Sequence, residues 1–182
     1  MRFIVALLTL ALSPALMATT SAFPPTAPGV MAIKTLPAGT LLKSAAPGDY
    51  FEQSGRLFGP LFRYISKQDI RMTVPVEAEL NPSAMYFWVA PDEVPKVVGS
   101  TGEVTVVQVP ERRVAVAGGK GGYNRRNFEA TQERLRVWLA GRSDYEAAGP
   151  AYVVYWNGPL TPWFLREYEV HVPVRPKSRN GD

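Results

Sequence analysis

Apolar residues recur at the three- and four-residue spacing of an α-helix in two parts of the chain, which predicts two amphipathic helices. The apolar face of the first consists of Leu57, Phe58, Leu61, Phe62 and Ile65, and that of the second of Phe128, Leu135, Trp138 and Leu139. Gly59-Pro60 is expected in the first turn of the first helix, where proline is tolerated. Asn124 or Asn127 is suited to cap the start of the second helix, and Gly141 follows its end.

Strand-like runs lie before and after each predicted helix. Residues 33–43 and 106–116 each combine an apolar alternation, a central proline and a second apolar run, and residues 70–76, 85–89, 152–156 and 169–174 follow the helices. Pro75 and Pro173 indicate edge positions or bulges, because proline cannot donate to a sheet ladder.

The two halves of the chain repeat each other at one constant offset. The matched pairs include Pro37 with Pro110, Gly48 with Gly121, and Tyr50 with Tyr123. We therefore predict an α+β fold in which a duplicated β-α-β-β unit forms a distorted antiparallel β-barrel with two helices against it. The alternative is a chance similarity between two strands that contain proline.

The N-terminus has the layout of a secretory signal peptide. Arg2 precedes a run from Phe3 to Leu12 that is apolar except for Thr9, and Thr20-Ser21-Ala22 supplies the small residues of a cleavage site. The run is too short to span a bilayer, so we expect cleavage near Ala22-Phe23 and a periplasmic or secreted protein. The alternative is a buried N-terminal helix. A Pro-rich leader (23–32), one domain (33–175) and a polar tail (176–182) would follow.

Composition narrows the chemistry. The 182 residues include no cysteine and one histidine, which excludes disulfides, thiolate metal sites and multi-histidine zinc sites. The net charge of +4 is too small and too dispersed to argue for nucleic acid as a partner.

Two pairs of motifs carry a family resemblance. Residues 59–65 (GPLFRYI) precede 70–76 (IRMTVPV), and residues 155–166 (YWNGPLTPWFLR) precede 169–174 (EVHVPV). Together they resemble the SOUL haem-binding protein family over about residues 30–175. The resemblance implies an eight-stranded distorted barrel with two helices, a fold shared with effector-binding domains of bacterial regulators that bind flat apolar cations. It also implies binding of haem or another tetrapyrrole, a small planar ligand, without a catalytic cycle. Together with the signal peptide, this favours an exported carrier or buffer.

A haem site needs an apolar slot, cations for the propionates and an axial ligand. His171 is the only imidazole, and the alternation Glu169-Val170-His171-Val172 places it with Glu169 on the solvent or groove face if the valines face the core. The alternative is a surface histidine without a ligand role. The family resemblance implies an axial histidine in the first half of the fold, where this chain has none.

The other candidates lie within the motifs. Met72 is a substitute ligand, although a core position is the expected one. Trp156 and Trp163 flank a turn and are suited to wall a groove. Arg63 and Arg166 are candidate propionate contacts. By the likeness to effector-binding domains, Glu169 would meet a cation.

Two other functions are compatible with the sequence. One is a small-molecule hydrolase that uses Glu169 as base, for which the chain offers no Ser-His-Asp set. The other is a structural or interaction module without a ligand. We expect a binding protein rather than an enzyme.

Overall fold

A computed structural model describes residues 21–158 and 160–178. Residues 1–20 of the predicted signal peptide and residues 179–182 of the predicted tail therefore lie outside the described residues. The described residues form β1 (Met31–Leu36), β2 (Gly39–Ala46), α1 (Tyr50–Lys67), β3 (Val76–Leu80), β4 (Ser83–Val89), η1 (Val94–Lys96), β5 (Thr105–Val109), β6 (Arg112–Lys120), α2 (Arg125–Ala140), β7 (Tyr145–Ala147), β8 (Tyr152–Tyr155), η2 (Trp163–Leu165) and β9 (Glu167–Pro176). No helix in this part of the chain is long and apolar enough to cross a membrane.

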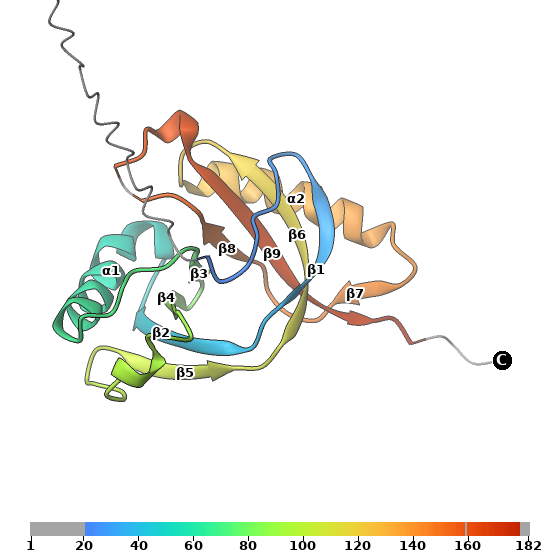
Figure 1. The fold of residues 1–182 in the computed structure, drawn as a ribbon. Coiled ribbons are helices and arrows are strands. Elements are labelled where there is room, and N and C mark those ends of the chain that lie inside the picture. The colour runs from blue at the N-terminus through green and yellow to red at the C-terminus, as the bar shows by residue number, and fades with distance from the viewer. Residues whose placement is uncertain (1–20, 159, 179–182) are drawn as a thin grey trace, which may run out of the picture.

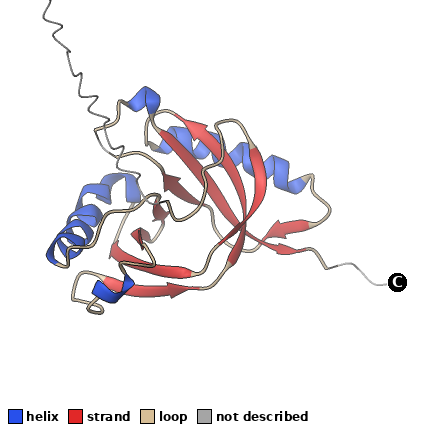
Figure 2. Ribbon diagram, viewed as in Figure 1, coloured by secondary structure: helices blue, strands red, loops and turns tan. Residues whose placement is uncertain are grey.

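The strands form one curled antiparallel sheet (Figures 1 and 2). Its order is β1-β6-β9-β8-β3-β4-β2-β5, and β7 adds to the C-terminal end of β9. Helix α1 packs on β2, β3 and β4, and α2 packs on β6, β7 and β9. The predicted α+β class, with two helices against a curled antiparallel sheet, is confirmed.

Apart from β7, which has no counterpart after α1, the order of α-helices and strands is the same in both halves of the chain. Strands β1 and β2 precede α1 as β5 and β6 precede α2. The starts of β2 and β6, at Gly39 and Arg112, are separated by the same offset as the ends of the two helices, at Lys67 and Ala140. Two strands then follow each helix in the sheet, β3 and β4 in the first half and β8 and β9 in the second.

Helix α1 is longer than its apolar spacing predicts. The Asp49 carboxylate accepts a hydrogen bond from the Phe51 amide (2.9 Å) and caps a helix that begins at Tyr50. Pro60 consequently lies inside the helix, so its expected place in the first turn was wrong. Phe62 is 50% exposed rather than part of the buried face. In α2 the Asn124 side chain caps the start, as one of the two expected residues.

The segment before β3 also differs from expectation. Residues 70–76 were expected to form a strand, but β3 begins only at Val76 and Val74 forms an isolated bridge to Ser21. Pro75 lacks the N–H that a ladder needs, and this explains why regular pairing starts after it.

The sheet has two buried faces with different contents. The face under the helices, called here the helix face, is apolar: Phe87, Val153 and Val170 of the sheet share one core with Leu61 of α1 and Leu135 of α2. Alternation along the strands turns the neighbouring residues to the other face, where Leu41, Trp88, Val114, Tyr152 and Val154 pack. This second face is covered by residues 21–28, called here the strap, and we therefore call it the strap face.

Candidate ligand sites

A cleft of about 550 Å³ opens between the N-terminal parts of the two helices and the sheet. Helix α1 contributes Tyr50, Phe51 and Phe58, and Tyr123 and Tyr155 come from the second half of the chain. Tyr50 and Tyr123, matched by the sequence repeat, thus line the same cleft. Five of the fifteen residues that line the cleft are therefore aromatic.

The aromatic rings of the cleft pack on one another. Tyr155 lies between Tyr123 and Tyr50, with ring centroids 4.1 Å and 6.1 Å away, respectively. The Tyr123 hydroxyl donates to the Glu167 carbonyl (2.9 Å) and accepts from the Asn157 amide (3.0 Å). Burial raises the pKa of Tyr123 to about 12 and raises that of Tyr50 as well. The raised pKa disfavours the phenolate form of both side chains, which present their rings to the cleft.

Two arginines and two methionines also line the cleft. Arg166 lies over the Tyr123 ring (5.2 Å), and Arg125 lies over Phe51 (5.2 Å) and pairs with Asp49. Met85 is buried, whereas Met72 is 38% exposed, so its expected core position was wrong. The reason is the irregular segment before β3, which carries Met72 along the edge of the cleft instead of into the sheet.

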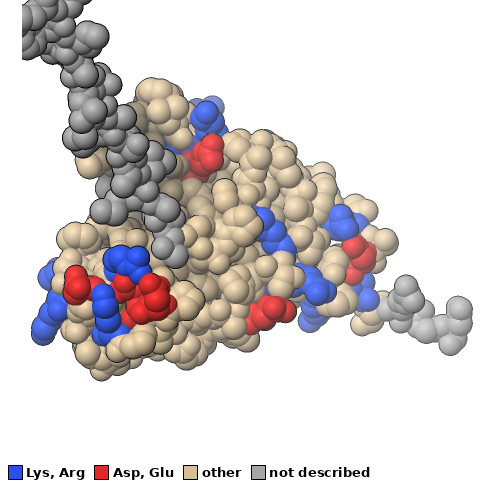
Figure 3. All heavy atoms as spheres, in the orientation of Figure 1, with Lys and Arg blue, Asp and Glu red and all other residues tan. Residues whose placement is uncertain are grey.

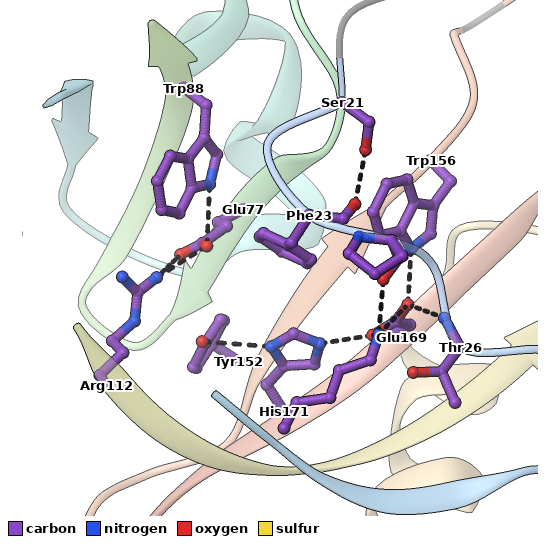
Figure 4. Close-up of polar contacts among 12 residues, drawn as sticks. Ser21, Phe23, Thr26, Glu77, Trp88, Arg112, Tyr152, Trp156, Glu169 and His171 are labelled. Atoms are coloured by element: carbon purple, nitrogen blue, oxygen red, sulfur yellow. Dashed lines mark hydrogen bonds and ion pairs between the residues drawn. The ribbon is translucent and has the colours of Figure 1, made fainter. Parts of the chain in front are cut away.

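The strap face contains a cluster of buried polar groups around Glu169 of β9 (Figure 4). The Trp156 indole N–H donates to Glu169 Oε1 (3.0 Å), and His171 Nε2 lies 2.7 Å from Oε2. Lys34 Nζ from β1 lies 3.3 Å from Oε2. Burial alone would raise the pKa of Glu169, but the hydrogen bond from His171, the Thr26 amide and Lys34 hold it below its usual value. Glu169 is therefore a buried carboxylate kept ionised by its neighbours.

A second carboxylate with similar partners lies across the same face. Glu77 of β3 accepts from the Trp88 indole N–H (3.0 Å) and from the Arg112 guanidinium (2.7 Å). The Arg112 guanidinium also lies over the Trp88 ring (5.5 Å). Each of the two carboxylates thus has one tryptophan N–H donor and one nearby cation, and in both cases the cation comes from the other half of the chain.

His171 is fully buried, contrary to the expected solvent or groove position. Because Glu169 is ionised and accepts, Nε2 is the donor in that contact, and Nδ1 lies 3.2 Å from the Tyr152 hydroxyl. Both ring nitrogens are engaged, so His171 could bind a metal only by breaking one of these contacts. The alternation correctly placed it with Glu169, but the strap covers that face, and the strap is distant in sequence.

The remaining predicted site residues lie apart from both groups. Arg63 pairs with Glu103 (3.0 Å) on the surface of α1, and Trp163 is 67% exposed in η2. Figure 3 shows acidic and basic side chains side by side near α1 and η1, where Arg71 pairs with Glu93. The predicted set therefore divides: Met72 and Arg166 line the cleft, whereas Trp156, Glu169 and His171 belong to the strap face.

Sequence reasoning missed several residues that the structure brings to these places. They are Phe51, Phe58, Arg125 and Tyr155 in the cleft and Phe23, Lys34, Glu77 and Arg112 on the strap face. The matched Tyr50 and Tyr123 were the signal that could have located the cleft. Nothing local marks Glu77 or Lys34, because their partners come from other strands.

The fold has known counterparts among solved structures. The C-terminal domain of EcmrR superposes with a TM-score of 0.64 at 14% identity, over 80% of this chain and 97% of that one. The chain spans only 57% of EcmrR in its DNA complex, with 80% of this chain covered at 15% identity and a TM-score of 0.64. A hydrolase from Listeria innocua gives a TM-score of 0.55 at 12% identity, over 82% of this chain and 94% of that one. No curated protein matches the sequence. At these identities the likeness concerns the fold alone.

A curled antiparallel sheet with two helices on one face and a cleft between them defines the class of α+β fold to which this chain belongs. The sequence matches the family described as "SOUL heme-binding protein" over residues 30–173. The chain belongs to the SOUL family.

Proposed function

We propose that this protein binds haem or another tetrapyrrole in the cleft between α1 and α2 and acts as an exported carrier or buffer. The observation that carries the proposal is the aromatic wall of the cleft, with Arg125 and Arg166 beside it. A flat macrocycle fits such a wall, and guanidinium groups are suited to bind its carboxylates in a bidentate manner. Family membership supports the same ligand class.

The lining of the cleft is better suited to contact the macrocycle than to coordinate its iron. Among its described lining residues, the potential iron ligands are the thioethers of Met72 and Met85 and the phenols of the tyrosines, and none is an imidazole. Burial raises the pKa of Tyr50 and Tyr123 and so disfavours the phenolate that would coordinate iron. We therefore expect a metal-free porphyrin to bind about as well as haem.

Export and duplication are part of the same proposal. The short apolar run and the small residues before Phe23 support a signal peptide and a periplasmic or secreted location, and the absence of cysteine suits a domain that needs no disulfide there. The order of elements, repeated at a constant offset, supports descent of the two halves from one duplicated unit.

We propose a binding protein rather than an enzyme. A hydrolase would use Glu169 as base, but the carboxylate is engaged by Trp156, His171 and the Thr26 amide beneath the strap. A base needs an open position within hydrogen-bond reach of its substrate. A module without a ligand would leave the aromatic cleft unexplained.

Titration with hemin and with protoporphyrin IX tests the proposal. We expect saturable changes in the Soret band with both, and about tenfold weaker binding in Arg166→Gln, the loss of one charge-assisted contact. Arg63→Gln is the matched control, because Arg63 lies outside the cleft. A spectrum identical to that of free hemin, or equal weakening by both variants, would contradict the proposal.

A further inference from the structure

The strap is attached to the sheet at both ends by backbone hydrogen bonds. The Ala22 amide donates to the Val74 carbonyl (2.9 Å), and the Gly29 amide donates to the Gly118 carbonyl (2.9 Å). Between these points the strap crosses the polar cluster (Figure 4). Its course is thus defined by contacts with two distant parts of the chain.

The strap face has a slot for one aromatic side chain. Phe23 is 6% exposed, and its ring meets the edges or faces of Trp88 and Trp156 at centroid distances of 5.8 Å and 5.4 Å, in nearly perpendicular geometry. His171 lies 6.0 Å away, and Lys34 Nζ is 5.8 Å from the centroid of the ring. Edge-to-face contacts of this kind are favourable beyond the burial of area.

Charged side chains on this face bind the backbone of the strap. Glu169 Oε1 accepts from the Thr26 amide, and Lys34 Nζ donates to the Pro24 carbonyl (2.7 Å). A buried charge pair is costly to desolvate unless its remaining donors and acceptors are satisfied. Here the strap provides one donor, the Thr26 amide, and one acceptor, the Pro24 carbonyl, to the pair of Glu169 and Lys34.

Gly118 of β6 leaves room for the strap. A Cβ at this position would lie 2.6 Å from the Thr26 carbonyl oxygen and closer still to that of Ala27. Any side chain would displace the strap or the strand. Gly118 therefore lets the strap backbone approach the sheet closely.

From the slot, the charge pair and the glycine, we propose that the strap face is a binding site for an extended peptide segment that begins with an aromatic residue. Its occupant is the chain's own segment, residues 23–28. The adjacent Pro24 and Pro25 favour an extended segment before it binds, which lowers the entropy lost on docking. If the signal peptide is cleaved before Phe23, the hydrogen bond from the Ala22 amide is lost, and the site holds the first residue of the exported chain through the remaining contacts of Phe23, Pro24 and Thr26. This inference does not depend on tetrapyrrole binding.

Peptide added in trans tests the site in the full chain carrying Phe23→Ala. Two of the four tryptophans contact Phe23, so the substitution should shift tryptophan emission to longer wavelength. The heptapeptide of residues 23–29 should reverse the shift saturably at concentrations of about 1 mM, since tethering normally supplies an effective concentration of that order. The same peptide with Ala in place of Phe23 should have no effect.

The double variant Phe23→Ala with Gly118→Ala is the matched control, because the added Cβ lies where the peptide backbone must pass. It should not respond to the heptapeptide. Equal responses to the two peptides, or a response in the double variant, would overturn the proposal.

Hydrogen exchange of the Thr26 amide provides a second test that needs only Gly118→Ala in a chain that retains Phe23. We expect exchange at Thr26 at least about tenfold faster than in the original chain, with amides of α1 and α2 still protected. Unchanged protection of Thr26 would show that the strap does not require the space at Gly118, and would refute the site.

Discussion

The two buried carboxylates of the strap face share one arrangement and serve different ends. Glu77 and Glu169 each accept an indole N–H at 3.0 Å, and each has a cation beside it. The hydrogen-bond partners described for Glu77 come from the strands β4 and β6, whereas Glu169 also binds the strap through the Thr26 amide. The same arrangement of a buried carboxylate, an indole N–H and a cation can therefore join strands within a sheet or hold a segment that crosses the sheet.

Removing each carboxylate should give the largest effects. We expect Glu169→Ala to lower the free energy of unfolding by about 4 kcal/mol, because it removes the ion-pair partner of the partly buried Lys34 and leaves the Trp156 indole N–H and His171 Nε2 without their acceptor. Glu77→Ala should cost about 3 kcal/mol for the same reason at Arg112, which is also partly buried. Urea denaturation measures both.

Hydrogen exchange distinguishes the two carboxylates further. Only Glu169→Ala should accelerate exchange at Thr26, since only Glu169 accepts from that amide. Equal acceleration in Glu77→Ala would mean that the strap responds to the stability of the whole face and not to Glu169.

Truncating Phe23 comes next in size. We expect Phe23→Ala to cost about 3 kcal/mol, as for a buried phenylalanine, by emptying the slot between the two tryptophans. Phe62→Ala is the matched control on the helix side, where the half-exposed ring should contribute less than about 1 kcal/mol. Similar losses in thermal denaturation would contradict the assigned role of Phe23.

The two tryptophans allow a symmetrical comparison. Trp88→Phe and Trp156→Phe each remove an indole N–H that donates to a carboxylate, and each should cost about 2 kcal/mol. Trp156 donates to Glu169, which binds the strap, so Trp156→Phe should also accelerate hydrogen exchange at the Thr26 amide. Trp88→Phe should leave that exchange unchanged. Chemical denaturation with exchange at Thr26 checks both parts.

The smallest expected effect is a pH dependence. The pKa of Glu169 is lowered from its usual 4.5, so the folded state binds a proton there less readily than the unfolded state. Its contribution to stability is present above pH 4.5 and is lost as the pH falls through the lowered pKa. The stability gap between the original chain and Glu169→Gln should therefore narrow from pH 7 to pH 3 in urea titrations. A constant gap would show that the charge of Glu169 is not linked to folding.

Local signals predicted much of the fold. Asn124 caps α2 through a contact with Asn127, three residues away, and the repeat placed Tyr50 and Tyr123 close to the starts of the two helices. The start of α1 was misjudged because the prediction relied on the apolar spacing, which begins at Leu57, whereas the cap is Asp49. Caps and periodicity act over one or two turns, which is why a sequence displays them.

The candidate sites were less predictable because they depend on distant contacts. Alternation placed Glu169 and His171 on one face, but not the fact that the strap covers it. Met72 and Trp156, both within family motifs, lie on opposite sides of the sheet in different sites.

The sequence by itself therefore determined the helices, the alternation of the strands and the family of the protein, since these follow from short-range patterns. The tertiary structure decided which residues share a site. Curling of the sheet brings Glu77 and Glu169 to the face that Phe23 covers, from parts of the chain far apart in sequence. Such contacts depend on strand order and register, which no local pattern of residues specifies.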